Sequence, residues 1–411
     1  MYVAWRPQLF PIFLITAALI GAVTGIVFGA TGVRLSRGGP LLVTVERRSL
    51  AGDEWRLWGG WERDTLPGTI LRLAGFGPGR DDRSGEQAIR DYFRITSQIR
   101  AAGDQPALAE SLTRKRQQYE NAVERQAEDW IAEAVGAAGL KRRLPLFGGT
   151  EITWPPPRVE LTTPPRILVR SPRDRIARAG DTLLRNDLSV ADAERIERET
   201  DTGDMVSIVE PVGGLAAYPA VVSGDRPFDG WLDTTAHEWV HHYLAFFPLG
   251  ERWGDGGAGV TLNETTANLA GREIASLIRT RHPLKLPQGE DGGVTGARCT
   301  AEPIDFSKEL HGLRLEVDAL LASGKVTEAE SVMEQRRRYL GEHCVFIRKI
   351  NQAYFAFHGS YADSAAASDP IGPKVQEVWE RTKDLGMFLR VMREVRSVAE
   401  LDSALATLGK R

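Results

Sequence analysis

The sequence predicts an α+β protein that is mainly helical, with an N-terminal transmembrane helix, a small sheet near the middle and a C-terminal helical part. An uncharged apolar run fills residues 7–33, helical patterns cover much of the remaining chain, and β-branched segments rich in proline lie within 148–223. Across its 411 residues the chain is 42% hydrophobic and 26% charged, as in ordinary globular proteins. This balance excludes a disordered, collagen-like or polytopic membrane protein.

The N-terminal run is long enough to cross a bilayer, because a spanning helix needs about 20 apolar residues. A signal peptide is the rival interpretation, but the apolar core of a signal peptide has only roughly 7–15 residues. We therefore predict a tail and transmembrane anchor over 1–36, which would make this a single-pass protein of the cell membrane. The charges at the two ends of the run do not decide its orientation.

Small residues recur every four positions inside this run, at Ala17, Gly21, Gly25 and Gly29. Such spacing lets two transmembrane helices approach closely, so the Gly21/Gly25/Gly29 face could support a homodimer. Glycine is also frequent in transmembrane helices that do not pair, and both interpretations stay open.

A juxtamembrane connector is predicted over 37–83, followed by a helical region over 84–147. In the connector, Trp55, Trp58 and Trp61 recur every three residues. They fit either an aromatic belt at the membrane surface or the packed face of a short helix. The helical region predicts helices over 85–103 and 106–139, the second with an apolar stripe typical of a buried helix face rather than a coiled-coil seam.

A central region over 148–285 predicts short strands around its proline-rich start, a helix over 181–201, and further strands at 205–211 and 215–223. The last region, 286–411, is predicted to be helical, beginning with a hairpin of helices over 305–322 and 326–344.

Two cysteines frame this predicted hairpin. Cys299 precedes its first helix and Cys344 ends its second, so both fall at the open end, within reach of a disulfide. A disulfide would place the catalytic domain outside the cytoplasm, whereas two reduced, buried cysteines would carry no such implication. Neither cysteine has the spacing of a metal site.

The histidines form the most informative cluster, because three of the seven fall within 237–242. His237 and His241 are four residues apart, so on a helix they project from one face and can bind one metal ion. Glu238 lies beside them and can take a proton from a water molecule at that metal. His242 points about 100° away from His241 on a helix and is interpreted as a supporting or packing residue.

A second predicted helix, over 259–279, carries an acidic residue near its start. Glu264 follows His241 after 22 intervening residues. A catalytic zinc site takes three protein ligands and keeps one position open. The segment Asn263-Glu264-Thr265-Thr266-Ala267, combined with His-Glu-x-x-His, resembles the gluzincin type of zinc metallopeptidase, and more loosely a group of predicted bacterial aminopeptidases.

This resemblance covers residues 205–280 and implies a zincin-like catalytic domain. It implies Zn²⁺ held by His237, His241 and Glu264, with Glu238 as general base. A residue one turn after the glutamate ligand orients the zinc ligands in thermolysin-like relatives. Here that residue is Asn268 in place of a carboxylate, and Asp233 and Glu273 are further candidates.

The resemblance also implies an edge strand that binds the substrate above the active helix. The segment 214–219 is the candidate, with Gly214, Ala216 and Tyr218 as substrate-binding residues. No acidic residue lies between Val212 and Ser223, so this strand does not favour exopeptidase specificity.

A hydrolase of this type needs a hydrogen-bond donor for the oxyanion of its transition state. The segment 350–374 offers Tyr354, His358 and Tyr361, and the resemblance favours Tyr361. Packing within a helix is the alternative role for both tyrosines.

Together these residues and the resemblance imply a membrane-anchored zinc metallopeptidase that hydrolyses a peptide or protein substrate. No nucleic-acid partner is expected, because lysine and arginine are scattered and the net charge is −3. One alternative is a catalytically inactive, zinc-stabilised, membrane-tethered binding or scaffold protein. Another is a helical sensor in which the histidine motif is accidental.

Overall fold

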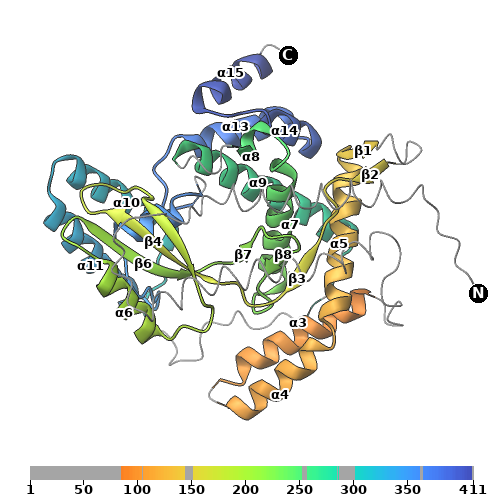
Figure 1. Cartoon of the computed structure of the whole chain (residues 1–411), viewed down its shortest axis with the longest axis horizontal. Helices are drawn as coiled ribbons and strands as arrows, with labels where there is room; N and C mark the ends of the chain where they lie inside the picture. Colours follow the sequence, from red (N-terminus) through yellow and green to blue (C-terminus); the bar gives the residue numbers. More distant parts are fainter. Residues whose placement is uncertain are drawn as a thin grey trace, which may run out of the picture.

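The computed structural model describes residues 85–103, 105–143, 151–251, 257–284, 286, 301–361 and 364–409. These residues form a mainly helical fold with small sheets (Figure 1). None of the helices among them is both long and apolar enough to span a membrane. The predicted fold class is therefore corrected: in the described chain it is mainly helical α+β without a transmembrane helix. The predicted anchor with its Gly21/Gly25/Gly29 face and the connector over 37–83 lie outside the described residues.

The chain enters the described fold through three helices. They are α3 (Gly85–Ala101), α4 (Pro106–Gln117) and α5 (Glu120–Ala137). A single helix was predicted over 106–139, and the structure divides it near Tyr119, where the apolar stripe has its one longer gap. The cause is a difference in packing, because α4 buries none of its residues whereas α5 buries one whole face against the core.

The strands are short and form three sheets. The first sheet pairs β1 (Lys141–Arg143) with β2 (Glu151–Thr153). The second sheet has the strand order β3 (Val159–Leu161), β8 (Ala220–Val222), β7 (Gly214–Leu215). The third sheet has the strand order β5 (Gly180–Leu184), β4 (Arg166–Pro172), β6 (Met205–Pro211). In the second sheet β3 and β8 are parallel and β7 is antiparallel to β8, so β7 forms one edge. The third sheet is antiparallel throughout.

The predicted helix over 181–201 is only partly correct. Its first residues form β5, and the helix α6 spans Val190–Thr200. Ser189 caps α6 by accepting from the backbone N–H of Asp192, whose side chain accepts from the backbone N–H of Ser189. This reciprocal cap fixes where the helix starts, so the residues before it are free to pair with β4.

The remaining elements are helices. They are α7 (Phe228–Leu244), α8 (Pro248–Glu251), α9 (Ala258–Arg281), α10 (Phe306–Ala322), α11 (Val326–Glu342), α12 (Gln352–His358), α13 (Ile371–Thr382), α14 (Leu385–Met392) and α15 (Val398–Leu408). The longest of these, α9, lies side by side with α7 near the middle of Figure 1.

Two main hydrophobic cores organise these elements. The first joins α3, α5, α7 and α9 to the C-terminal helices α13, α14 and α15. The second joins the sheet of β4, β5 and β6 to α10, α11 and α12. The other face of that sheet packs on α6. The cores interleave along the chain, so the region predicted over 286–411 contributes to both of them.

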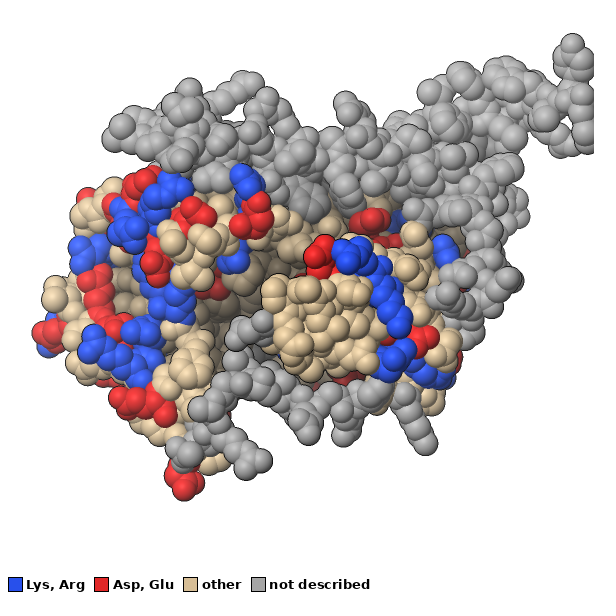
Figure 2. Space-filling model, turned by 90° about the horizontal axis from the view of Figure 1, so that it is seen from below, with Lys and Arg blue, Asp and Glu red and all other residues tan. Residues whose placement is uncertain are grey.

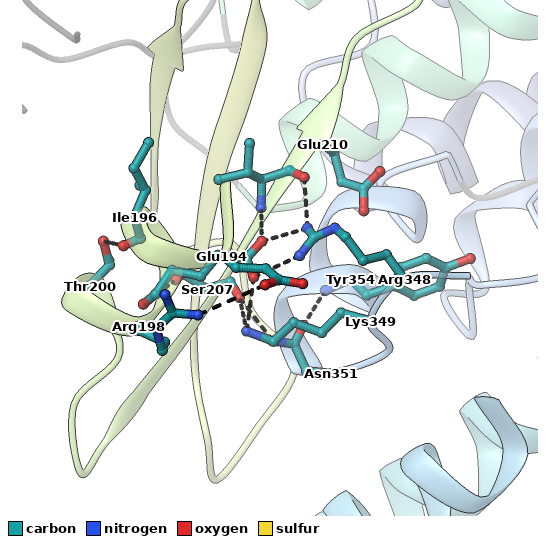
Figure 3. A network of polar contacts seen from close by, with 12 residues as sticks. Glu194, Ile196, Arg198, Thr200, Ser207, Glu210, Arg348, Lys349, Asn351 and Tyr354 are labelled. Atoms are coloured by element: carbon teal, nitrogen blue, oxygen red, sulfur yellow. Dashed lines mark hydrogen bonds and ion pairs between the residues drawn. The ribbon is translucent and has the colours of Figure 1, made fainter. Parts of the chain in front are cut away.

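A buried carboxylate ties α6 and β6 to the segment that leads into α12. The side chain of Glu197 is 3% exposed and accepts hydrogen bonds from the backbone N–H of Val209 and from the guanidinium of Arg348. Lys349 and Asn351 both donate to the carbonyl oxygen of Ser207, and Asn351 caps α12 (Figure 3). We call Glu197, Arg348 and Lys349 the α6 clamp. It fixes the position from which α12 starts.

Two carboxyl groups of α5 bind the backbone of β3, which forms an edge of the second sheet. Glu124 accepts from the backbone N–H of Leu161 at 2.8 Å, and Glu128 accepts from that of Val159 at 3.1 Å. Arg158 balances the charge of Glu128 at 2.6 Å. Side chains of α5 therefore accept the hydrogen bonds of backbone N–H groups of β3.

Cys344, which follows α11, is disulfide-bonded. Cys299, the other cysteine of the sequence, lies outside the described residues. On the outer surface, basic and acidic side chains are interspersed over the part of the molecule at the left of Figure 2.

Candidate metal centre

The helices α7 and α9 form the base of the candidate site, and a glycine sets their distance. A Cβ atom at Gly271 of α9 would lie 2.8 Å from the backbone nitrogen of His237 on α7. Such an approach is closer than real Cβ contacts, so any side chain at Gly271 would force the helices apart. On the α7 side, Leu232, Val240 and Leu244 are fully buried in the first core, which fixes the face that the histidines present to α9.

Three predicted ligands converge at this helix pair. The Nε2 atoms of His237 and His241 lie 2.8 Å apart. The Oε2 atom of Glu264 on α9 lies 3.3 Å from the first of them and 3.5 Å from the second. All three side chains are largely buried, with exposed fractions of 11%, 11% and 8%.

This group could hold a metal ion. Ligand atoms at about 2.0–2.2 Å around one tetrahedral zinc ion lie roughly 3.3–3.6 Å from one another. The two distances from Glu264 to the histidines, 3.3 Å and 3.5 Å, match this spacing, and the 2.8 Å between the two Nε2 atoms is shorter. Two imidazole nitrogens and one carboxylate oxygen also form a donor set that borderline metal ions accept. The residues therefore fit a single bound ion with room for a further ligand on the side of the cavity.

Electrostatics favours a cation at this point. Burial alone would raise the pKa of Glu264, but the neighbouring histidines, His241 foremost, lower it to about 2. The carboxylate therefore stays ionised although it is buried. Burial alone would lower the pKa of His241, and the charge of Glu264 reverses that shift and raises it.

One ligand is oriented by an asparagine next to Glu264. The Nδ1 atom of His241 lies 2.8 Å from Oδ1 of Asn263, which fits an N–H donated to the amide oxygen. The amide nitrogen of Asn263 donates to the carbonyl oxygen of Leu249, which fixes its orientation. This arrangement leaves Nε2 of His241 as the atom that faces the metal position.

The three residues predicted to orient the ligands occupy different places. Asn268 lines the cavity one turn after Glu264. Asp233 accepts from Arg279 at 3.0 Å, and Nδ1 of His237 is buried without a hydrogen-bond partner in the described structure, so the two are not bonded. Glu273 does not line the cavity, and burial raises its pKa.

The metal position opens into a cavity of about 610 Å³ between the two cores. From the first core, α7 and α9 supply the three predicted ligands and Glu238. From the second core, the sheet supplies Ile167 and Leu183, and the segment around α12 supplies Phe357. The cavity is therefore a property of the way the cores meet and not of either core alone.

The predicted general base, Glu238, lines this cavity, and its carboxylate lies next to the backbone of Gly214. Glu238 is buried, and burial raises the pKa of its carboxyl group, which makes it a stronger proton acceptor. A Cβ at Gly214 would lie 2.3 Å from its Oε1. Only glycine at 214 leaves the carboxylate of Glu238 in its place.

The predicted edge strand is shorter than expected. Only Gly214 and Leu215 form β7, which pairs with β8 and borders the cavity, as does Ala216. Tyr218 does not line the cavity; it is buried and its hydroxyl donates to the carbonyl oxygen of Pro156.

His242 of α7 binds the backbone just after β7. Its Nε2 donates to the carbonyl oxygen of Ala217 at 2.6 Å, and its ring contacts Tyr218 edge-on. The side chain is fully buried, and burial lowers its pKa to about 4. His242 therefore joins α7 to the end of β7 and is not among the residues that converge on the metal position.

Of the predicted oxyanion donors, Tyr361 is the tyrosine that reaches the metal position. Its ring centroid lies 6.2 Å from that of His237, and it lines the cavity. The charge of Glu264, followed by burial, raises its pKa well above the ordinary value, so the hydroxyl remains a donor. Tyr354 is buried in the second core, and His358 lines the cavity farther along.

Three further residues shape the site although the sequence analysis assigned them no role. Asn263 orients His241, Gly271 sets the helix distance, and Arg226 lines the cavity beside Glu238. Gly271 follows Glu264 by seven residues, two helical turns, so it shares a face with that ligand; this periodicity is a signal that could have indicated it. For Arg226 the sequence offers no comparable signal.

Comparisons with known proteins do not extend this description. No protein-family model matches the chain, and neither a curated protein nor a solved structure matches it.

Proposed function

We propose that this protein is a zinc-dependent peptidase of the gluzincin type, with His237, His241 and Glu264 as zinc ligands. One observation carries the proposal: the buried triad opens into a large cavity together with a buried carboxylate, that of Glu238. A zinc ion used only for stability has its coordination closed by four protein ligands, whereas three ligands leave a position for chemistry. When bound, zinc would act as a Lewis acid that lowers the pKa of water and polarises a carbonyl group.

Glu238 is assigned the proton transfers. Its carboxylate accepts a proton from the attacking water as the water oxygen bonds to the scissile carbonyl carbon. The same proton then passes to the amide nitrogen as the C–N bond breaks, which leaves an acid and an amine. The carboxylate of Glu238 lines the cavity beside the predicted ligands, so one group can accept the proton and then release it.

Tyr361 is assigned to the oxygen of the scissile carbonyl. Its position beside His237 and its persistent hydroxyl proton support this role. A positioned donor of this kind stabilises the charge that develops on oxygen in the transition state.

The edge of β7 is assigned to the substrate backbone. An extended peptide can add to an exposed sheet edge by main-chain hydrogen bonds. Gly214 and Ala216 border the cavity there and leave the backbone accessible, since neither has a large side chain. Tyr218, which faces Pro156, is not part of this assignment.

The test combines metal content with hydrolysis. We expect the purified full chain to bind one zinc ion per molecule by elemental analysis and to cleave members of a peptide mixture. Glu238→Gln is expected to keep the metal and to lose about 100-fold or more in kcat, because general-base catalysis contributes 10²–10⁴-fold. Glu110→Gln on the exposed helix α4 is the matched control and should change neither quantity.

The outcome also separates the two alternatives. A stoichiometric metal without hydrolysis of any peptide would favour the zinc-stabilised binding or scaffold protein. Absence of a stoichiometric metal in the wild-type chain would overturn the proposal and leave the accidental motif.

A further inference from the structure

Two consecutive glycines, Gly213 and Gly214, line the cavity next to the proposed general base Glu238 and place no side chain there. A Cβ at Gly214 would collide with the carboxylate of Glu238, and a Cβ at Gly213 would lie 2.8 Å from Nη2 of Arg226. The ends of these two side chains therefore lie against neighbouring residues of one backbone segment. This places the guanidinium of Arg226 about one residue's length along the cavity from the general base.

The side chain of Arg226 is exposed, and a hydrogen bond to α7 orients its guanidinium. Its Nη1 donates to the hydroxyl of Thr234 on α7 at 2.6 Å, and that hydroxyl donates to the carbonyl oxygen of Gly230. Nη2 rests against Gly213. A side chain oriented in this way loses less conformational freedom on binding a ligand than one without such a contact.

Arg226 is also a cation without a carboxylate partner in the described part of the chain. The other charged groups of the cavity wall are engaged: Arg178 pairs with Asp181 at 2.7 Å, and Asp233 pairs with Arg279. Arg272 has contacts of its own. The charge of Arg226 is therefore the one that a bound ligand can neutralise near Glu238.

We propose that Arg226 is a specificity residue that binds a carboxylate group of the substrate adjacent to the scissile bond. The planar guanidinium matches a carboxylate in shape and charge, and Arg226 lines the cavity. The carboxylate can belong to an Asp or Glu side chain or to the C-terminus of a peptide. This inference rests on the proposed peptidase function.

The experiment uses the zinc-loaded full chain and one cleaved peptide in matched forms. Glu and Gln are exchanged at the positions that flank the cleaved bond, and the C-terminus is either a free acid or an amide. We expect the wild type to prefer one acid form by roughly 10- to 100-fold in kcat/KM, mainly through KM, as for a hydrogen bond between charged groups. The Glu/Gln and acid/amide arms identify which carboxylate is bound.

Two independent variants should abolish that preference. Arg226→Gln removes the charge, and Gly213→Ala displaces the guanidinium while leaving it in the protein. Arg226→Lys should retain part of the preference, because it keeps the charge and loses the planar fork. Arg198→Gln on the exposed face of α6 is the matched control and should leave the preference unchanged.

Binding provides a second readout that does not require turnover. Fluorescence anisotropy with the Glu238→Gln protein should show tighter binding of the acid peptide than of its neutral counterpart. Adding Arg226→Gln should remove the difference. If no peptide is cleaved but this binding difference persists, the peptidase proposal fails while the carboxylate site stands.

Three results would overturn the inference. One is an unchanged acid preference in Arg226→Gln, and another is a wild type that treats acid and neutral peptides alike. The third is a preference for basic peptides, which would indicate Asp181 on the opposite wall, whose Oδ1 is buried without a hydrogen-bond partner.

Discussion

Gly271 on α9 lies directly against the backbone of His237 on α7, with space for a hydrogen but not for a methyl group. This contact brings Glu264, two turns earlier on the same helix, within 3.3 Å of the Nε2 atom of His237. The geometry of the three metal ligands therefore depends on a residue that has no side chain.

Gly271→Ala should separate the two helices and weaken metal binding. An extra methyl group in a packed core typically costs about 1–3 kcal/mol. In contrast, Gly312→Ala on α10, where a Cβ would meet no atom, should stabilise the protein by up to about 1 kcal/mol. Chemical denaturation and zinc titration of both variants check this. Equal zinc affinity in Gly271→Ala and the wild type would contradict the role given to this contact.

Zinc should raise the melting temperature of the wild type. A ligand at about 100 times its Kd stabilises the folded state by about 2.7 kcal/mol, and chelation should reverse the gain. His241→Ala should abolish the response, since it removes one of the three ligands. His311→Ala, at an exposed position of α10, is the control. A zinc response that survives in His241→Ala would place the metal elsewhere.

Asn263→Ala should weaken zinc binding without removing a ligand. The amide oxygen of Asn263 holds Nδ1 of His241, and losing such an orienting partner typically costs about 10–100-fold in metal affinity. Competition with a coloured chelator measures the change. The control is Asn186→Ala, which removes an exposed hydrogen bond to the carbonyl oxygen of Thr163 and should have no effect on the zinc affinity. If the Asn263 variant binds zinc as the wild type does, the orienting role is wrong.

The buried carboxyl of Glu124 should make the fold less stable at alkaline pH. Burial, followed by the charge of Glu160, raises its pKa from 4.5 to about 8. A raised carboxyl pKa means that the folded state binds the proton more tightly than the unfolded state. Stability from this group is therefore complete below about pH 4.5 and is lost as the pH rises to about 8.

The free energy of unfolding of Glu124→Gln, measured by denaturation between about pH 5 and about pH 9, tests this. The variant should lose less stability than the wild type over the interval. Glu110→Gln, at an exposed position, should follow the wild type. Parallel curves for Glu124→Gln and the wild type would show that the group does not titrate in this range.

The α6 clamp should be the most sensitive polar feature outside the site. Arg348→Met would leave the carboxylate of Glu197 buried beside Lys349 alone, and breaking a buried ion pair costs about 3–5 kcal/mol. The double variant with Glu197→Leu should be less destabilised than the single one, because no unpaired charge remains. Arg198→Met at the surface is the control for urea denaturation. An effect no larger than that of the control would show that the α6 clamp does not stabilise the fold.

Much of the local structure follows from the sequence because it depends on short-range patterns. The helix periods predicted α3, α9, α10 and α11 closely, and one helical turn between His237 and His241 places both on one face. The division of the predicted helix at 106–139 and the strand β5 were missed. Both depend on which residues other elements bury, and a local pattern does not contain that information.

The sequence by itself determined the donor atoms: two histidines one turn apart, a glutamate beside them, and a second glutamate on the next long helix. Only the tertiary structure decided that these atoms meet, because Gly271 allows α9 to approach α7. It also decided that Asn263 orients His241, that Tyr361 lies beside His237, and that Gly213 and Gly214 clear space for Arg226 and Glu238. Such contacts join residues far apart in the chain, and they form only when many packed side chains fix the two cores against each other.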